Sequence, residues 1–256
     1  MRHGFKILSA ALLGSLFGLS SPSMAAIISV DINGYSPQAA RFGPDAVGLT
    51  FSGVAQIGSA LDVWNGMPIA DFTTNTLTAP SLKLTDGTTV TTVSFTVTAV
   101  SQSSPYLFQD KIVADWSSGN DLMTDYLVVA SATNATFANF FGGIPEQLIL
   151  TIAGLNPGGT YDLHLIGGQG TSHRGVFTFG ATEVTASSGY SLNTASFVGL
   201  TANVNGVISG TLDANPVTEL GLFNGFQIEG AFPIPEPASM SVLGLIGVGL
   251  MGRRRV

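Results

Sequence analysis

Residues 88–101 read TTVTTVSFTVTAVS, and this stretch shows the clearest alternation in the chain. Its second half places apolar side chains at every second position and hydroxyl side chains between them: Val93, Phe95, Val97 and Ala99 against Ser94, Thr96 and Thr98. Successive side chains of a strand point to opposite faces of a sheet. The pattern therefore predicts a strand with one face in a core.

Similar patterns on both sides of this stretch predict a chain made mainly of strands. Tyr161, Leu163 and Leu165 alternate with polar residues, whereas residues 148–152 form a mostly apolar run that is typical of a more fully buried strand. Other runs predict further strands at residues 27–32, 47–53, 126–130, 176–179, 197–204, 207–212 and 220–228.

Turn residues separate these runs. Asp86-Gly87 and Asn205-Gly206 each lie between two strand-like runs, which is the strongest short signal for a hairpin. Asn156-Pro157-Gly158-Gly159 is a third turn sequence. Because about ten short strands follow one another without a sustained helical period, we expect an all-β fold, a jelly-roll-like antiparallel β-sandwich over residues 26–232.

The first 25 residues have the three parts of a secretory signal peptide. Arg2 and Lys6 give a positive start, residues 7–19 are uncharged, and small residues precede the expected cleavage site. We expect cleavage after Ala25, with Ala26 as the second choice, and therefore export by the secretion machinery.

Residues 233–256 also have three parts. Pro235-Glu236-Pro237 is stiff and extended, because each proline fixes its own φ and disfavours helix in the residue before it. Residues 238–252 carry no charge, and Arg253, Arg254 and Arg255 follow. This uncharged span makes a helix of only about 22 Å, which is short for a hydrocarbon core of about 30 Å. The arginines would stay in the cytoplasm.

This tail resembles the PEP-CTERM sorting signal of exported bacterial proteins. The matching residues are Pro235, Glu236, Pro237 and Ala238, the short apolar span, and Arg253 to Arg255. The resemblance implies transient insertion into the inner membrane of a Gram-negative bacterium, often one that makes exopolysaccharide. It also implies processing by an exosortase, a membrane transpeptidase-like enzyme that removes the helix and leaves the protein at the cell surface or outside the cell. A plain tail anchor is the alternative.

Between the two ends the chain is acidic and contains no cysteine. The region keeps four cations and fifteen acids, a net charge of −11, which argues against nucleic acid and anionic membranes as partners. The absence of cysteine excludes disulfides and thiolate chemistry within this chain. About 205 residues are enough for one domain with a sizeable core.

A second, weaker resemblance concerns the fold. Residues 150–168, LTIAGLNPGGTYDLHLIGG, look like the strand–turn–strand of galactose-binding-like and malectin-like sandwich domains, and residues 222–230 resemble their closing strand. Such domains usually bind sugars through loops at one end or on a concave face. The matching positions are turn and core residues, so no binding residue transfers. A fibronectin-type domain with a tyrosine corner is the first alternative.

Several residues are candidates for ligand binding. Sugar rings stack on exposed aromatic side chains beside polar groups, and both tryptophans have loop-like neighbours, although both could equally be core residues. Arg174 and His173 lie in a glycine-rich loop after a strand, where ligands often bind, although a structural arginine would look the same. The candidates are Trp64, Asn65, Trp116 with Asp115 and Asn120, Tyr35, His173 and Arg174.

Metal binding and catalysis have weaker signals. Asp115, Asn120, Asp121 and Asp125 form one acidic stretch that could hold calcium, but the spacing does not match an EF-hand loop. His164 lies two residues from Asp162, as expected for an exposed strand, and no acid stands two residues after any glutamate of the mature region. We therefore expect no enzyme and no resident cofactor.

The sequence thus predicts an exported, exosortase-processed surface or matrix protein with a non-enzymatic, carbohydrate-contacting β-sandwich. A purely structural or adhesive matrix protein without a sugar site is the second hypothesis. A secreted glycoside hydrolase, which would need two facing carboxylates, is the third.

Overall fold

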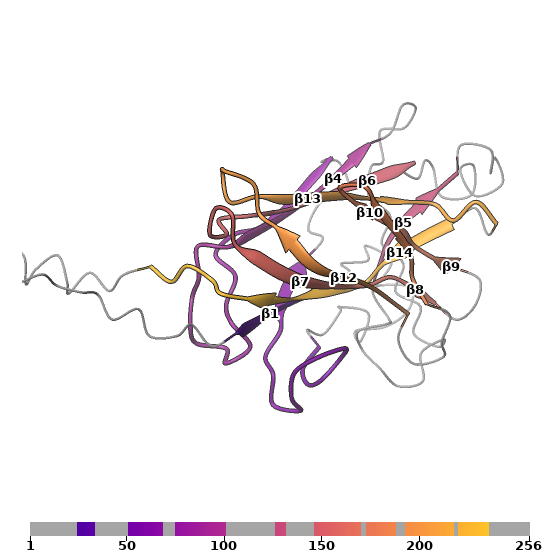
Figure 1. The fold of residues 1–256 in the computed structure, drawn as a ribbon. Coiled ribbons are helices and arrows are strands. Elements are labelled where there is room, and N and C mark those ends of the chain that lie inside the picture. The colour runs from indigo at the N-terminus through magenta and orange to yellow at the C-terminus, as the bar shows by residue number, and fades with distance from the viewer. Residues whose placement is uncertain are drawn as a thin grey trace, which may run out of the picture.

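The described part of the chain folds entirely into strands and turns (Figure 1). The computed structural model describes residues 25–33, 51–68, 75–100, 126–131, 146–169, 173–187, 193–217 and 220–235. The strands are β1 (Ala26–Asn33), β2 (Asn65–Pro68), β3 (Thr76–Ala79), β4 (Ser94–Val100), β5 (Leu127–Ala130), β6 (Gln147–Ala153), β7 (Thr160–Ile166), β8 (Gly168–Gln169), β9 (His173–Arg174), β10 (Val176–Phe179), β11 (Thr182–Thr185), β12 (Thr194–Thr201), β13 (Ile208–Asp213), β14 (Leu220–Phe223) and β15 (Gly225–Gly230). The all-β class is confirmed for these residues.

Two sheets form the body of the protein. One has the strand order β12-β7-β15-β1-β2 and the other the order β11-β10-β13-β6-β4-β3. Figure 1 shows them as two layers, with β4, β6, β13 and β10 above β1, β7 and β12. Neighbouring strands are antiparallel, except that β1 and β2 run parallel. The two layers have the arrangement of a β-sandwich.

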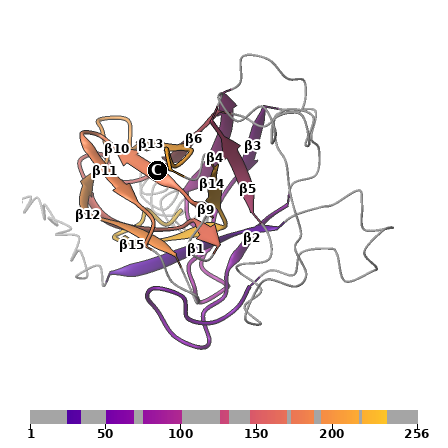
Figure 2. The ribbon, with the colours of Figure 1, turned by 90° about the vertical axis from the view of Figure 1, so that its right-hand side faces the viewer.

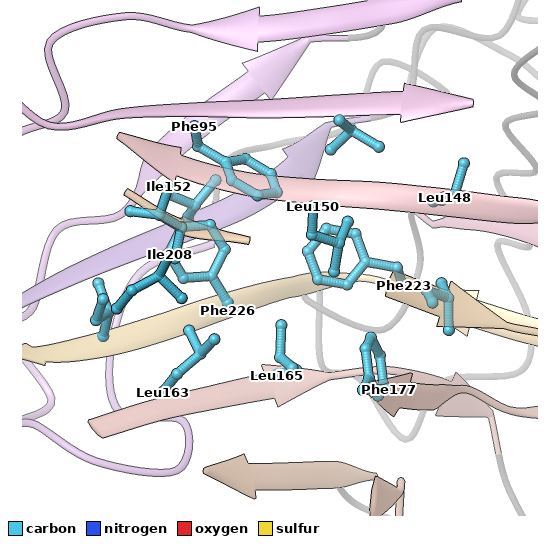
Figure 3. Close-up of a cluster of buried hydrophobic side chains, with 14 of the residues drawn as sticks. Phe95, Leu148, Leu150, Ile152, Leu163, Leu165, Phe177, Ile208, Phe223 and Phe226 are labelled. Atoms are coloured by element: carbon cyan, nitrogen blue, oxygen red, sulfur yellow. The ribbon is translucent and has the colours of Figure 1, made fainter. Parts of the chain in front are cut away.

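The alternation seen in the sequence builds the core between the layers. In β4, β6 and β7 every second side chain is buried, and these residues belong to one hydrophobic cluster that draws on both sheets. Figure 3 shows Phe95 of β4 against Phe226 of β15, with 4.6 Å between the ring centroids. Phe223 lies 5.9 Å from Phe95 on the same centroid measure.

The Asp86-Gly87 turn is the hairpin that the sequence predicts. The amide of Leu84 donates to the carbonyl of Thr89 at 2.9 Å. The Asp86 carboxylate accepts the amides of Thr88 and Thr89 and the Thr89 hydroxyl. These hydrogen bonds favour the charged form and lower the pKa of Asp86 to about 2.

The hairpin prediction at Asn205-Gly206 is wrong in one respect. A tight turn does form there, with the amide of Gly206 donating to the carbonyl of Asn203 at 2.9 Å. However, the turn joins β12 of one sheet to β13 of the other. The chain reverses locally, but its two strands find partners in different layers. The turn at 156–159 likewise carries the chain from β6 to β7, across the sandwich.

Two predicted strands also differ from the structure. In the described part of 47–53 there is only an isolated bridge, between Ser52 and Val63. The run 220–228 is divided at Asn224 into β14, which pairs with β5, and β15, which joins the five-stranded sheet. The chain passes very close to its neighbour at Gly225, because a Cβ there would meet the carbonyl oxygen of Val30.

Candidate functional site

Trp64 is buried, with 4% of its surface exposed. Its indole N–H donates to the carbonyl of Gly53 at 2.9 Å, and its ring meets Phe51 edge-on at a centroid distance of 5.2 Å. Ile166 of β7 completes this small cluster. Trp64 therefore has the core placement that the sequence left open, and it offers no exposed ring face to a sugar.

Asn65 holds backbone segments together. Its side-chain amide donates to the carbonyls of Ser29 and Lys83, at 2.9 and 2.8 Å. Its side-chain oxygen accepts the amide of Lys83 at 2.8 Å. These three bonds join β1 and β2 to the segment before the Asp86 hairpin. The Asn65 side chain therefore stabilises the fold by binding backbone groups.

The burial of Trp64 follows from the path of residues 51–64, which lie against the outer face of the five-stranded sheet. Gln227 of β15 anchors them, because its side-chain oxygen accepts the amides of Gln56 and Ile57 at 2.8 and 3.0 Å. Its amide group donates to the Ser29 hydroxyl and to the carbonyl of Ile57 at 3.1 and 3.0 Å. Gln227 and Ser29 are both completely buried. This part of the sheet face is therefore covered.

His173 and Arg174 form β9, which pairs with β8 in a short hairpin. The hairpin lies beside β14, close to the viewer in Figure 2 and at the end of the sandwich away from the start of β1. Arg174 is half-buried, and its Nε is buried without a hydrogen-bond partner. An unsatisfied buried donor is costly. The buried Nε is closed to solvent, so a bound acceptor would have to meet the terminal nitrogens of the half-buried Arg174 guanidinium.

His164 lies on the outer face of the five-stranded sheet. Its Nδ1 is 2.8 Å from the hydroxyl of Ser196 on the neighbouring β12. Burial lowers the pKa of His164, while the charges of Asp162 and Glu229 act in the opposite direction. The Asp162 carboxylate accepts the amide of Gly199 at 2.8 Å. A serine–histidine contact resembles part of a hydrolase triad, but no carboxylate hydrogen bond to this imidazole is found in the described residues.

The two ends of the folded region lie side by side. Ala26, the first residue of β1, pairs with Gly230, the last residue of β15. Figure 1 shows the start of β1, and with it the end of its partner β15, at the left-hand end of the sandwich. Ala25, the expected cleavage position, is exposed immediately before β1.

The three residues after β15, Ala231–Pro233, are held on the domain, and we call them the C-terminal clasp. The carbonyl of Ala231 accepts the Asn156 side-chain amide at 2.7 Å and the Tyr161 hydroxyl at 3.0 Å. The carbonyl of Pro233 accepts the amide of Thr92 at 3.2 Å. Pro235, the first residue of the proline–glutamate–proline motif, is exposed only two residues further on.

Aromatic packing completes the clasp. The Phe232 side chain is 9% exposed and its ring centroid lies 5.6 Å from that of Tyr161. The Tyr161 hydroxyl also accepts the amide of Asn156 at 3.0 Å, the bond to upstream backbone that characterises a tyrosine corner. Burial raises the pKa of Tyr161, so the hydroxyl remains a donor at neutral pH. The sequence indicated that Tyr161 is a core position. Only the structure shows that its hydroxyl and the Asn156 side chain both donate to the carbonyl of Ala231.

Other predicted residues lie outside the described residues. They are Tyr35, Trp116 with Asp115 and Asn120, the acidic positions Asp121 and Asp125, and Glu236, Pro237, Ala238, Arg253, Arg254 and Arg255. Within the described ranges, no group of three histidine or acidic side chains is placed to hold a metal ion. The same ranges contain no helix that is long and apolar enough to span a membrane.

No protein-family model matches the chain, and no curated protein is similar to it.

Proposed function

We propose that this chain is an exported protein of a bacterial cell surface or extracellular matrix, delivered by its C-terminal sorting signal and processed by an exosortase. In this proposal residues 1–25 form a signal helix and residues 238–252 a short transmembrane helix. The β-sandwich between them is non-enzymatic and has jelly-roll connectivity. Support for that connectivity comes from the last strands, since β13 lies between β10 and β6, and β15 between β7 and β1.

One observation carries the proposal. The first described strand begins at Ala26, directly after the expected cleavage site. The last described residue with a backbone hydrogen bond, Pro233, stands just before the proline–glutamate–proline motif. The folded region thus fits the space between the two signals. Removal of either signal would leave the contacts among the described residues 26–233 in place, as a protein that is processed at both ends requires.

Alanine substitution of Pro235, Glu236 and Pro237 tests the delivery step. They follow β15, the last strand of the described region, in the chain, so the domain should fold normally. We expect the full-length protein to accumulate in the inner membrane, because the motif that the processing enzyme reads is gone. Cell fractionation and intact mass would show the unprocessed form. If the variant has the same mass and the same location as the unaltered protein, the motif does not direct processing, and the proposal is contradicted.

Carbohydrate contact is the second candidate function, and Arg174 is the observation that favours it. Its half-buried guanidinium belongs to the β8–β9 hairpin, and sugar hydroxyls or uronate carboxylates are the acceptors that extracellular polysaccharide supplies. The hairpin position at one end of the sandwich agrees with a loop-based site. A purely structural matrix protein would bind no sugar through Arg174.

Binding of the exported protein to arrayed glycans, with and without calcium, tests this candidate. We expect binding that falls about tenfold in Arg174→Met, since a hydrogen bond to a charged group contributes about 1.5–3 kcal/mol. Arg174→Lys keeps the charge, so it separates loss of the guanidinium geometry from loss of charge. A folded protein that binds no glycan would leave the structural matrix role.

A further inference from the structure

The C-terminal clasp fixes how far the sorting motif can extend from the folded domain. Among the residues described up to Pro235, Pro233 is the last with a hydrogen bond to the domain, and Ile234 alone separates it from Pro235. Even a fully extended chain places Glu236 only about 11 Å from Pro233. A compact domain of this size has a radius of gyration of about 17 Å. When the clasp is closed, the reach of Glu236 from Pro233 is therefore shorter than the radius of the domain, so the motif stays near the domain surface.

Two uncharged turns border the clasp, while Glu229 and Asp162 form a register pair on the adjoining strands. The turns at 154–159 and 202–207 border this end, and neither contains a charged residue. Val204 is 87% exposed and Ile234 is 56% exposed. β1 also starts here, beside Gly230. A membrane enzyme that reaches the motif must either approach this end of the domain closely or wait until the clasp opens.

Opening the clasp does not require unfolding of the sandwich. The clasp lies beyond β15, and its contacts are the two side chains that hold Ala231, the amide of Thr92 and the buried ring of Phe232. None of the ladder pairs of β15 involves residues 231–233. Local segments of this kind open more easily than the core does. An open clasp would add three residues to the free chain, about 10 Å of additional reach.

We propose that the clasp limits the rate at which the sorting signal is processed. This inference rests on the proposed function, since it assumes that the motif is read by a membrane enzyme. In the closed state the folded domain crowds the motif, and in the open state the motif is presented on a longer, flexible segment. Cleavage therefore follows the fraction of molecules with an open clasp, and the processed protein can close the clasp again.

Pulse-chase measurement of processing in the full-length protein tests this proposal. Asn156→Ala removes one donor to Ala231, and Phe232→Ala removes the buried ring. The double variant should raise the open fraction, and with it the processing rate, by about tenfold or more. Asn205→Ala is the matched control in the neighbouring turn, where the side chain is exposed, and it should process at the normal rate.

A second variant does not disturb the fold. Insertion of Gly-Ser-Gly-Ser between Ile234 and Pro235 leaves every clasp contact in place and lengthens the reach by about 14 Å. It should raise the rate as the double variant does. Unchanged or slower processing in the insertion variant would overturn the proposal. The two failures are distinguishable. Normal processing of the alanine-substituted motif would contradict the proposed function, whereas a failed insertion test alone would contradict only the role of the clasp.

Discussion

Replacing Phe95 by alanine is expected to destabilise the protein by about 3–5 kcal/mol, as found for phenylalanine truncation in well-packed cores. Phe95 is 1% exposed. Its ring lies against Phe226, and Phe223 is the next aromatic ring, so both layers of the sandwich lose contacts with the same side chain. The substitution leaves a cavity that the surrounding strands cannot fill. Urea unfolding should show a lower midpoint with an unchanged slope.

Val204→Ala is the control for this substitution. Val204 is 87% exposed, so its truncation should change the free energy of unfolding by no more than about 0.5 kcal/mol. A Phe95→Ala protein as stable as this control would mean that the two sheets do not share the core described above. A changed slope would indicate that the substitution alters the denatured state or the two-state character of unfolding.

The strands that the sequence predicted well are those whose pattern is local. β4, β6 and β7 alternate along their own length, and burial follows that alternation residue by residue. β2 was missed, because its sequence NGMP contains both glycine and proline and has no alternation. It is a strand because it pairs with β1 in parallel. The local sequence of β2 cannot indicate a pairing with residues more than thirty positions away.

The candidate site was harder to predict, for the same physical reason. Trp64 stands next to Asn65-Gly66 and looks like a loop residue, yet it is buried because residues 51–64 fold back over the sheet. Gln227 alternates with the apolar residues Phe226 and Ile228, yet it is completely buried. The sequence of a strand cannot show whether another segment covers a polar side chain on the outer face of the sheet.

Gln227→Met should therefore have an effect much larger than its position on the outer face suggests. Methionine has a similar length but leaves the amides of Gln56 and Ile57 without their acceptor. Each unsatisfied group costs about 1–3 kcal/mol. We expect a loss of about 3 kcal/mol, reduced from the full sum because water can reach part of the released segment. With Trp116→Phe as background, red-shifted emission of Trp64 would report that residues 51–64 have detached.

Gln147→Met provides the matched control, because it makes the same chemical change at a half-buried position. The Gln147 side chain donates one hydrogen bond, to Asp213 at 2.8 Å, and water can replace it, so the expected loss is below about 1 kcal/mol. Equal stability of the two variants would contradict the anchoring role of Gln227. A large loss of stability with unchanged Trp64 emission would show that Gln227 stabilises the sheet itself, through Ser29, and that residues 51–64 stay in place without it.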